Sequence, residues 1–128
     1  MDVLETAAKT GDKNADVLYY LALLNNEVGD KKYALIHFGA AYKLHPENPR
    51  LYYNYGLLLQ QTGNSDKAIS VLKYGLKRFR NSADINYALA YIYLQRGQAG
   101  KALPYVKTLK RLDPDNPGYQ RLFTVLGI

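Results

Sequence analysis

The chain has 128 residues, about half of them apolar, and a formal net charge of +6. Its length suits one domain with a sizeable buried core, and the sequence shows neither a signal peptide nor an apolar run of about eighteen residues that could span a membrane. The lack of cysteine excludes disulfides, thiolate nucleophiles and cysteine-based metal sites, but it leaves the localisation open.

A fixed period of 34 residues organises the predicted elements. Two residue types recur at this spacing: glycine at Gly29, Gly63 and Gly97, and alanine at Ala34, Ala68 and Ala102. Each glycine is expected to end a first helix in the left-handed conformation, and each small alanine to let a second helix approach the first closely. The period therefore predicts three helix–turn–helix units.

In chain order, the pattern begins with a partial unit, continues through three full units and ends with a C-terminal capping helix. The whole chain is predicted to be one domain, residues 1–128, divided into segments 2–12, 15–48, 49–82, 83–116 and 117–128. The partial unit at the start fits only the second helix of a preceding repeat. We therefore expect the chain to be a fragment of a longer protein.

Polar residues and prolines mark the ends of the second helices. Asp30 and Asn64 are good N-caps for the helices that follow them, whereas Gln98 at the equivalent position is a poor one. Pro46 and Pro114 are expected to end second helices because proline cannot continue a helix.

The last predicted helix carries a wide apolar stripe, formed by Leu122, Phe123, Val125 and Leu126. Terminal units of repeat arrays expose an apolar face that something must cover. The stripe either packs on the last full unit or meets a neighbouring subunit, and we favour packing within the chain.

With these markers the chain resembles the tetratricopeptide repeat family over nearly its whole length. Counting the units from Ala15, Pro49 and Ala83, the family's small residue at position 8, glycine at position 15 and alanine at position 20 are present in all three. The departures from the pattern are Asn25, Asn86, Leu109, and Arg80 in place of the usual proline. The resemblance implies an all-α fold, a right-handed α-solenoid of stacked antiparallel helix pairs, whose first helices line a concave groove.

The resemblance also sorts the tyrosines. Tyr52, Tyr55 and Tyr93 fall at positions that face neighbouring helices, and they are predicted to be core residues. Tyr19, Tyr53 and Tyr87 share position 5, which faces the groove, and are predicted to form a ladder there. Groove-facing positions make one helical stripe, and they also include Asp16 and Glu27. The predicted peptide-binding groove consists of Tyr19, Leu23, Asn26, Arg50, Tyr53, Asn54, Leu57, Gln60, Gln61, Asp84, Tyr87, Tyr91, Leu94 and Gln95.

This predicted surface is aromatic, rich in amides and nearly uncharged. Tyrosine gives a large contact area with a polar tip, and amides can bond a peptide backbone. The predicted function is a non-catalytic protein–protein interaction scaffold that binds a peptide or partner segment in the groove. Alternatively, the tyrosines only fill the inner wall, or the domain self-associates through its repeat ends or its C-terminal helix.

Part of the family grips the acidic tails of chaperones with a carboxylate clamp built from lysine, asparagine and arginine. The corresponding positions in this chain are Tyr19, Leu23, Asn54, Asp84 and Ala88, of which only Asn54 matches. The Asp84 carboxylate would repel an acidic tail, so a chaperone C-terminal tail is rejected as the partner.

Signals for chemistry are weak throughout. His37 and His45 lie eight residues apart and have no second ligand at helical spacing, so no metal site is predicted. The glycines at Gly97 and Gly100 belong to the turn between helices and do not form a phosphate-binding loop. We predict no catalytic residue, no cofactor and no enzymatic activity.

Positive charge is concentrated in the second half of the chain, where residues 65–128 hold eleven Lys or Arg and four Asp or Glu. Attraction to nucleic acid or to an anionic membrane surface is one interpretation. Solvated helix faces are the favoured interpretation from sequence alone, because the basic residues match no nucleic-acid-binding motif.

Overall fold

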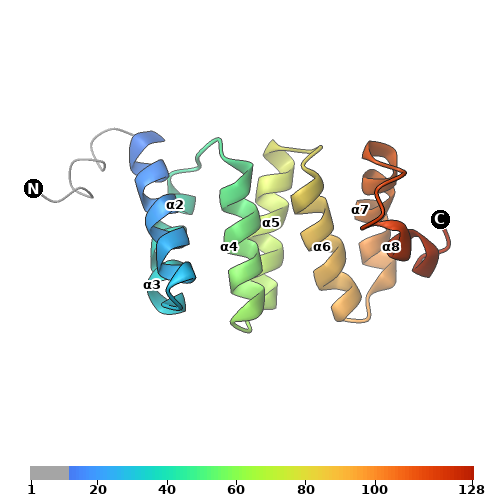
Figure 1. Cartoon of the computed structure of the whole chain (residues 1–128), viewed down its shortest axis with the longest axis horizontal. Coiled ribbons are helices and arrows are strands. Elements are labelled where there is room, and N and C mark those ends of the chain that lie inside the picture. Colours follow the sequence, from blue (N-terminus) through green and yellow to red (C-terminus); the bar gives the residue numbers. More distant parts are fainter. Residues whose placement is uncertain (1–11) are drawn as a thin grey trace, which may run out of the picture.

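The computed structural model describes residues 12–128, which form a row of seven helices and the turns between them (Figure 1). The helices are α2 (Asp12–Glu27), α3 (Lys31–Lys43), α4 (Pro49–Gln61), α5 (Ser65–Arg78), α6 (Ala83–Gln95), α7 (Ala99–Leu112) and α8 (Gln120–Val125). No strand occurs among these residues, and the predicted all-α fold is confirmed for them. The partial unit expected at residues 2–12 lies, except for its last residue, outside the described part.

The first six helices form three hairpins, which pair α2 with α3, α4 with α5, and α6 with α7. The first helices of the pairs, α2, α4 and α6, make one layer, called the inner layer here. The second helices, α3, α5 and α7, make the outer layer behind it (Figure 1). Contacts of α3 with α4, α5 with α6, and α4 with α6 join each pair to the next, as in an α-solenoid.

The turn within each pair depends on the periodic glycine. Gly29, Gly63 and Gly97 have φ angles of 85°, 88° and 72°, which are costly for residues that carry a Cβ atom. The next residue in each turn donates its N–H to a carbonyl five residues earlier: Asp30 to Asn25 at 2.8 Å, Asn64 to Leu59 at 2.8 Å, and Gln98 to Tyr93 at 2.9 Å. This hydrogen bond satisfies a free carbonyl at the end of the first helix and reverses the chain.

The caps of the outer helices follow the sequence prediction. The side chain of Asp30 accepts a hydrogen bond from the backbone N–H of Tyr33, and that of Asn64 accepts one from Lys67. Gln98 makes no such bond at the start of α7, and its Oε1 atom is buried without a hydrogen-bond partner. The outer layer therefore contains two capped helices and one uncapped one.

The turn that lacks proline is held by a second departure from the family pattern. The buried amide of Asn86 donates its Nδ2 to the carbonyls of Arg80 at 3.3 Å and Ser82 at 2.8 Å. The Ser82 hydroxyl caps α6 by accepting from the N–H of Ile85. Asn86 thus stabilises from inside the core a turn that proline would otherwise stiffen.

A charged side chain joins the first two helix pairs. Arg78, at the end of α5, donates from Nη1 to the carbonyls of His45 and Pro46 and to the hydroxyl of Tyr52. Its guanidinium also lies 3.7 Å from the carboxylate of Glu47. The turn between α3 and α4 is therefore held by α5, the second helix of the second pair.

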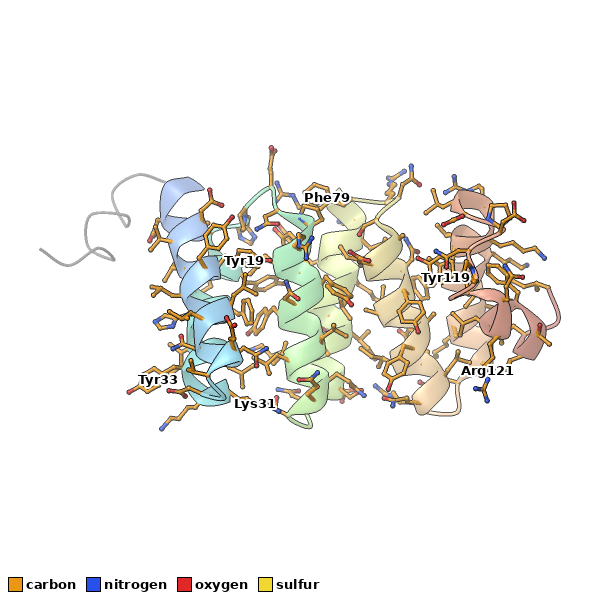
Figure 2. All side chains as sticks on the ribbon, in the orientation of Figure 1. Tyr19, Lys31, Tyr33, Phe79, Tyr119 and Arg121 are labelled. Carbon is orange, nitrogen blue, oxygen red and sulfur yellow. The ribbon has the colours of Figure 1, made fainter. Side chains whose placement is uncertain are left out.

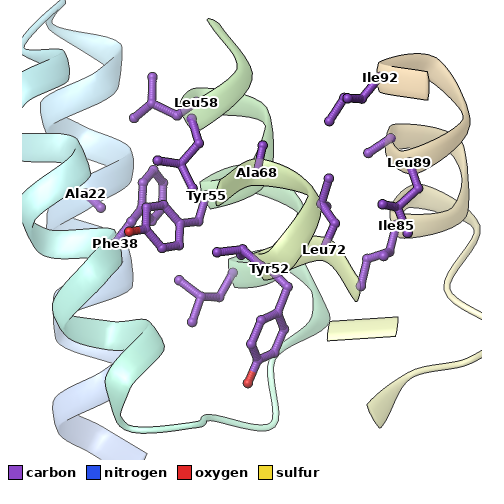
Figure 3. Close-up of a cluster of buried hydrophobic side chains, with 14 of the residues drawn as sticks. Ala22, Phe38, Tyr52, Tyr55, Leu58, Ala68, Leu72, Ile85, Leu89 and Ile92 are labelled. Atoms are coloured by element: carbon purple, nitrogen blue, oxygen red, sulfur yellow. The ribbon is translucent and has the colours of Figure 1, made fainter. Parts of the chain in front are cut away.

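Two clusters of buried side chains form the core along the row, and the larger one contains the tyrosines predicted to be core residues. Figure 3 shows Tyr52 and Tyr55 within it. Tyr52, Tyr55 and Tyr93 are 0%, 3% and 5% exposed, so their prediction as core residues is confirmed. The ring of Tyr55 stacks on Phe38 of α3, with centroids 6.0 Å apart. These large side chains fill the space between one helix pair and the next.

The C-terminal helix α8 is shorter than the segment 117–128 assigned to it from sequence. Asn116 accepts a hydrogen bond from the N–H of Gly118 at 2.8 Å, and the resulting turn delays the start of the helix until Gln120. Phe123 is buried against Val106 and Leu109 of α7. Packing within the chain, the interpretation favoured from sequence, therefore covers Phe123 and part of Leu122 and Leu126, whereas Val125 stays 65% exposed. No helix in the described range is both long and apolar enough to cross a bilayer.

Candidate functional site

The predicted groove residues all lie on the three helices of the inner layer. We call the solvent-facing side of these helices the inner face. Its exposed members are Asn26, Arg50, Gln61, Asp84, Tyr91 and Gln95. Its half-buried members are Leu23, Tyr53, Asn54, Leu57, Gln60, Tyr87 and Leu94.

Tyr19 does not belong to this accessible surface, and its prediction as a groove residue is corrected. Its side chain is only 5% exposed, because the rings of Tyr20 and Phe38 pack against it with centroids 5.4 and 6.1 Å away. Its hydroxyl accepts a hydrogen bond from Nδ2 of Asn54 at 2.9 Å. The side chain therefore joins α2 to α4 and offers no open ring to a ligand.

The other two tyrosines of the predicted ladder, Tyr53 and Tyr87, lie close to each other on the inner face. The pKa of the Tyr53 phenol is raised, first by burial and then by the negative charge of Asp84 and the neighbouring Tyr87. Tyr87 pairs with a further ring, that of Tyr119, at a centroid distance of 5.8 Å. The row of tyrosines is therefore Tyr53, Tyr87 and Tyr119, displaced by one unit from the row predicted.

Tyr119 is the residue that the repeat pattern missed. It lies at the opposite end of the row of helices from Tyr19 (Figure 2). Burial raises the pKa of its phenol, and the charges of Asp84 and Asp113 act in the same direction. The sequence Asn116–Pro117–Gly118 before it is a turn signal, and this signal could have indicated that Tyr119 precedes the last helix.

A chain of side-chain amides links two helices of the inner face. Gln60 on α4 donates from Nε2 to Oε1 of Gln95 on α6 at 3.0 Å, and Gln95 donates to the hydroxyl of Tyr91 at 2.8 Å. Gln60 Oε1 is buried and has no partner in this arrangement. Rotating both amides and the hydroxyl gives the reverse chain, in which Gln60 Oε1 accepts from Gln95. These linked side chains can therefore present either a hydrogen-bond donor or a hydrogen-bond acceptor to a ligand.

Charges on the inner face are few. The helices α4 and α6 together carry Arg50 and Asp84, and α2 adds the exposed Asp16 and Glu27. Tyr91, on α6, is 43% exposed. The surface can therefore offer ring faces, hydroxyls and amides over most of α4 and α6, with a carboxylate at the start of α6.

One cavity lies away from these residues. It has a volume of about 740 Å³ and runs along α3, where it is lined mainly by apolar side chains such as Leu35, Ile36 and Leu44, with Lys43 and Lys67 at its edge. None of the predicted groove residues lines it. The inner face is an open surface and not an enclosed pocket.

The two histidines lie away from the inner face and are separate from each other. His37 Nδ1 is 2.7 Å from Oδ1 of Asn25, so these two polar side chains satisfy each other between α3 and α2. The ring of His45 packs edge-on against Tyr42 and at a tilt against Tyr74. Among residues 12–128, no three side chains of the metal-binding types come together.

Comparison with known proteins identifies the architecture. A family model described as tetratricopeptide repeat matches residues 63–124, and a second with the same description matches residues 37–70. A search of curated protein sequences gave no match.

Solved structures of this fold align over most of the chain. The first tetratricopeptide repeat domain of Spaghetti (RPAP3), bound to the HSP90 peptide SRMEEVD, has a TM-score of 0.80 at 14% identity, covering 92% of this chain and 96% of that one. The type III secretion chaperone SycD of Yersinia enterocolitica, in complex with a peptide of the translocator YopD, has a TM-score of 0.72 at 24% identity, covering 88% and 86%. The R50E mutant of MamA has a TM-score of 0.71 at 27% identity, covering 86% and 80%.

The periodic glycine turns, the stacked helix pairs and these alignments agree with one another. The two family matches together span residues 37–124, more than half of the chain. The chain therefore belongs to the tetratricopeptide repeat family.

Proposed function

We propose that the chain is a non-catalytic protein-interaction scaffold that binds a peptide or partner segment on its inner face. The observation that carries this proposal is that the inner face presents the half-buried rings of Tyr53 and Tyr87. It also presents the exposed side chains of Tyr91 and Gln95, which are hydrogen-bonded to each other. Two structures of the same fold hold bound peptides, which supports this class of function.

The chemistry of the inner face suits a segment recognised through its backbone and its apolar side chains. Tyrosine rings provide contact area at a low entropic cost, because the side chain has few rotatable bonds. Gln60 and Gln95 can donate to a backbone carbonyl or accept from a backbone N–H, depending on the direction of the amide chain. The partner we propose is therefore a largely uncharged segment.

An acidic peptide such as the one bound by the RPAP3 domain does not suit this face. Asp84 contributes a negative charge beside Tyr53, and Tyr19 and Ala88 offer no positive charge at the other two clamp positions that require lysine or arginine. The chaperone-tail specificity of that relative is therefore not carried over to this chain.

The test is selection of peptides from a random library on the purified domain, followed by affinity measurement with variants. The double variant Tyr53→Ala/Tyr87→Ala should weaken binding of the selected peptides by tenfold or more, because buried aromatic contacts dominate such interfaces (roughly 1 to 2 kcal/mol each). Tyr33→Ala is the control, since Tyr33 is an exposed tyrosine on α3 in the outer layer.

Circular dichroism must show that the double variant keeps its helices. Equal affinity of the folded double variant and the wild type would contradict the assignment of the inner face. Equal loss of affinity in Tyr33→Ala would also contradict it.

Self-association is a second candidate, and one observation favours it. Six of the eight large hydrophobic side chains that are exposed among the described residues lie in the first helix pair or next to it: Tyr20, Leu24, Val28, Tyr33, Ile36 and Leu44. On α2, Tyr20 and Leu24 follow each other at helical spacing and are 66% and 56% exposed. Light scattering should then show dimers that Leu24→Asp abolishes, and a monomer at all concentrations would exclude this candidate.

A further inference from the structure

Each helix of the outer layer presents a stripe of exposed residues to solvent, separate from the inner face. On each outer helix the stripe follows spacings of four, three and four residues, opposite the buried side. We call these positions the outer stripe, and they are Lys32, Ile36, Gly39 and Lys43 on α3, Asp66, Ser70, Lys73 and Lys77 on α5, and Gly100, Pro104, Lys107 and Arg111 on α7. All of them are exposed except the half-buried Gly39.

Nearly all charged side chains of the outer stripe are positive. Six of its side chains are cationic and one is anionic, and that one, Asp66, is paired with Arg96 at 2.9 Å. Over their full lengths the outer helices carry eleven Lys or Arg and one Asp, whereas the inner helices carry two basic and four acidic residues. The two layers therefore differ strongly in charge.

Local interactions explain only part of this pattern. Lys43, Lys77 and Arg111 lie in the last turns of their helices, where positive charge is favourable. Lys73 lies over the ring of Tyr93, 5.8 Å from its centroid. Neither explanation covers Lys107. The two ion pairs formed among the described residues involve Arg78 and Arg96, so the stripe lysines have no carboxylate partner there.

We propose that the outer stripe docks the domain on the surface of an anionic lipid bilayer. Three helices side by side present cations over a broad face, and a bilayer surface is a broad partner of the opposite charge. Ile36, which is 52% exposed, lies between Lys32 and Lys43, an arrangement in which an apolar side chain enters the headgroup region while lysines stay at the phosphates. The outer stripe contains no aromatic side chain for base stacking, so a bilayer fits better than a single-stranded nucleic acid.

The test is co-sedimentation with vesicles of phosphatidylcholine alone, or of phosphatidylcholine with about one third phosphatidylserine. Binding should require phosphatidylserine and should weaken as salt is raised, since salt screens exposed charges. The triple variant Lys43→Gln/Lys77→Gln/Lys107→Gln should bind about a hundredfold more weakly, at about fivefold per lysine.

A matched variant separates the stripe from net charge alone. Arg50→Gln/Arg80→Gln/Arg121→Gln removes the same amount of charge from exposed residues outside the stripe and should bind within a few fold of the wild type. Equal loss in both triple variants, no binding to phosphatidylserine vesicles, or tight binding to RNA or DNA without vesicle binding would each overturn the proposal. Tyr53→Ala/Tyr87→Ala should leave vesicle binding unchanged, so this test does not depend on the proposed peptide binding.

Discussion

Gly56 and Gly75 show how single residues set the distance between helices. A Cβ atom added to Gly75 would lie 2.5 Å from Cβ of Tyr52, and one added to Gly56 would lie 2.5 Å from Cγ of Leu72. Real Cβ atoms do not come this close to other carbon atoms. Gly75 therefore offsets the size of Tyr52, which stands where the first unit has Leu18.

We expect Gly75→Ala to destabilise the domain by about 1 to 3 kcal/mol, because the new methyl group overpacks a closed core. Gly100→Ala is the control, since a Cβ there meets nothing within 4 Å. The control should be neutral or stabilising by about 0.5 to 1 kcal/mol, because alanine favours helix over glycine. Urea unfolding measures both, and a Gly75→Ala variant as stable as Gly100→Ala would contradict the packing argument.

The correction at Tyr19 also belongs to the residue scale. Its position in the repeat is equivalent to those of Tyr53 and Tyr87, so the repeat pattern alone does not distinguish it from them. The difference comes from Phe38 and Asn54, which reach Tyr19 from two other helices. A periodic pattern describes the face of a helix, and it does not describe how far neighbouring side chains extend over that face.

At the scale of the element, the outer helices differ in how they begin. Those that start after Asp30 and Asn64 have side-chain caps, and α7, which starts after Gln98, has none. Glutamine carries the amide of asparagine on a chain one methylene longer, and its oxygen is buried without a partner. An unsatisfied helix end and an unsatisfied side-chain atom therefore occur at the same residue.

We expect Gln98→Asn to stabilise the domain by about 0.5 to 2 kcal/mol, because the shorter side chain can accept the free N–H groups of the first turn. The reverse change, Asn64→Gln, should destabilise by a similar amount at the equivalent position of α5. Thermal and urea unfolding report both changes. If Gln98→Asn leaves stability unchanged while Asn64→Gln lowers it, the missing cap at α7 has no energetic importance.

The sequence predicted the helix pairs well because their turns have strict requirements. Gly29, Gly63 and Gly97 all adopt positive φ, which few other residues tolerate. The repeat pattern did not predict Tyr119, because the turn before it interrupts the 34-residue period. The predicted groove residues therefore end at Gln95, in the third unit. The charge difference between the layers is not evident from the net charges of the two halves of the sequence, because the charge alternates from one helix to the next.

At the scale of the whole molecule, tyrosines respond together to alkaline pH. Burial is the first cause that raises the pKa of five of them along the row: Tyr42, Tyr52, Tyr53, Tyr105 and Tyr119. In the unfolded chain their phenols would titrate near the ordinary value of 10.0. Above that pH, the folded state therefore holds more protons on these residues than the unfolded state does.

We expect stability to be constant toward neutral pH and to fall as the pH rises above about 10, because deprotonation favours the unfolded chain. Denaturant midpoints measured at several pH values, together with tyrosinate absorbance, check this. Tyrosinate should appear in the same pH range in which the helices are lost. Complete ionisation of all thirteen tyrosines in a fully helical protein would contradict it.

The separation of charge between the two layers gives the molecule an electric dipole across its short dimension. In the field of any charged surface, such a body experiences a torque before it makes contact. An anionic surface would turn the outer layer toward itself and the inner layer toward the solvent. Molecules that gather on such a surface would therefore arrive with one orientation, each presenting Tyr53 and its neighbours to the same side.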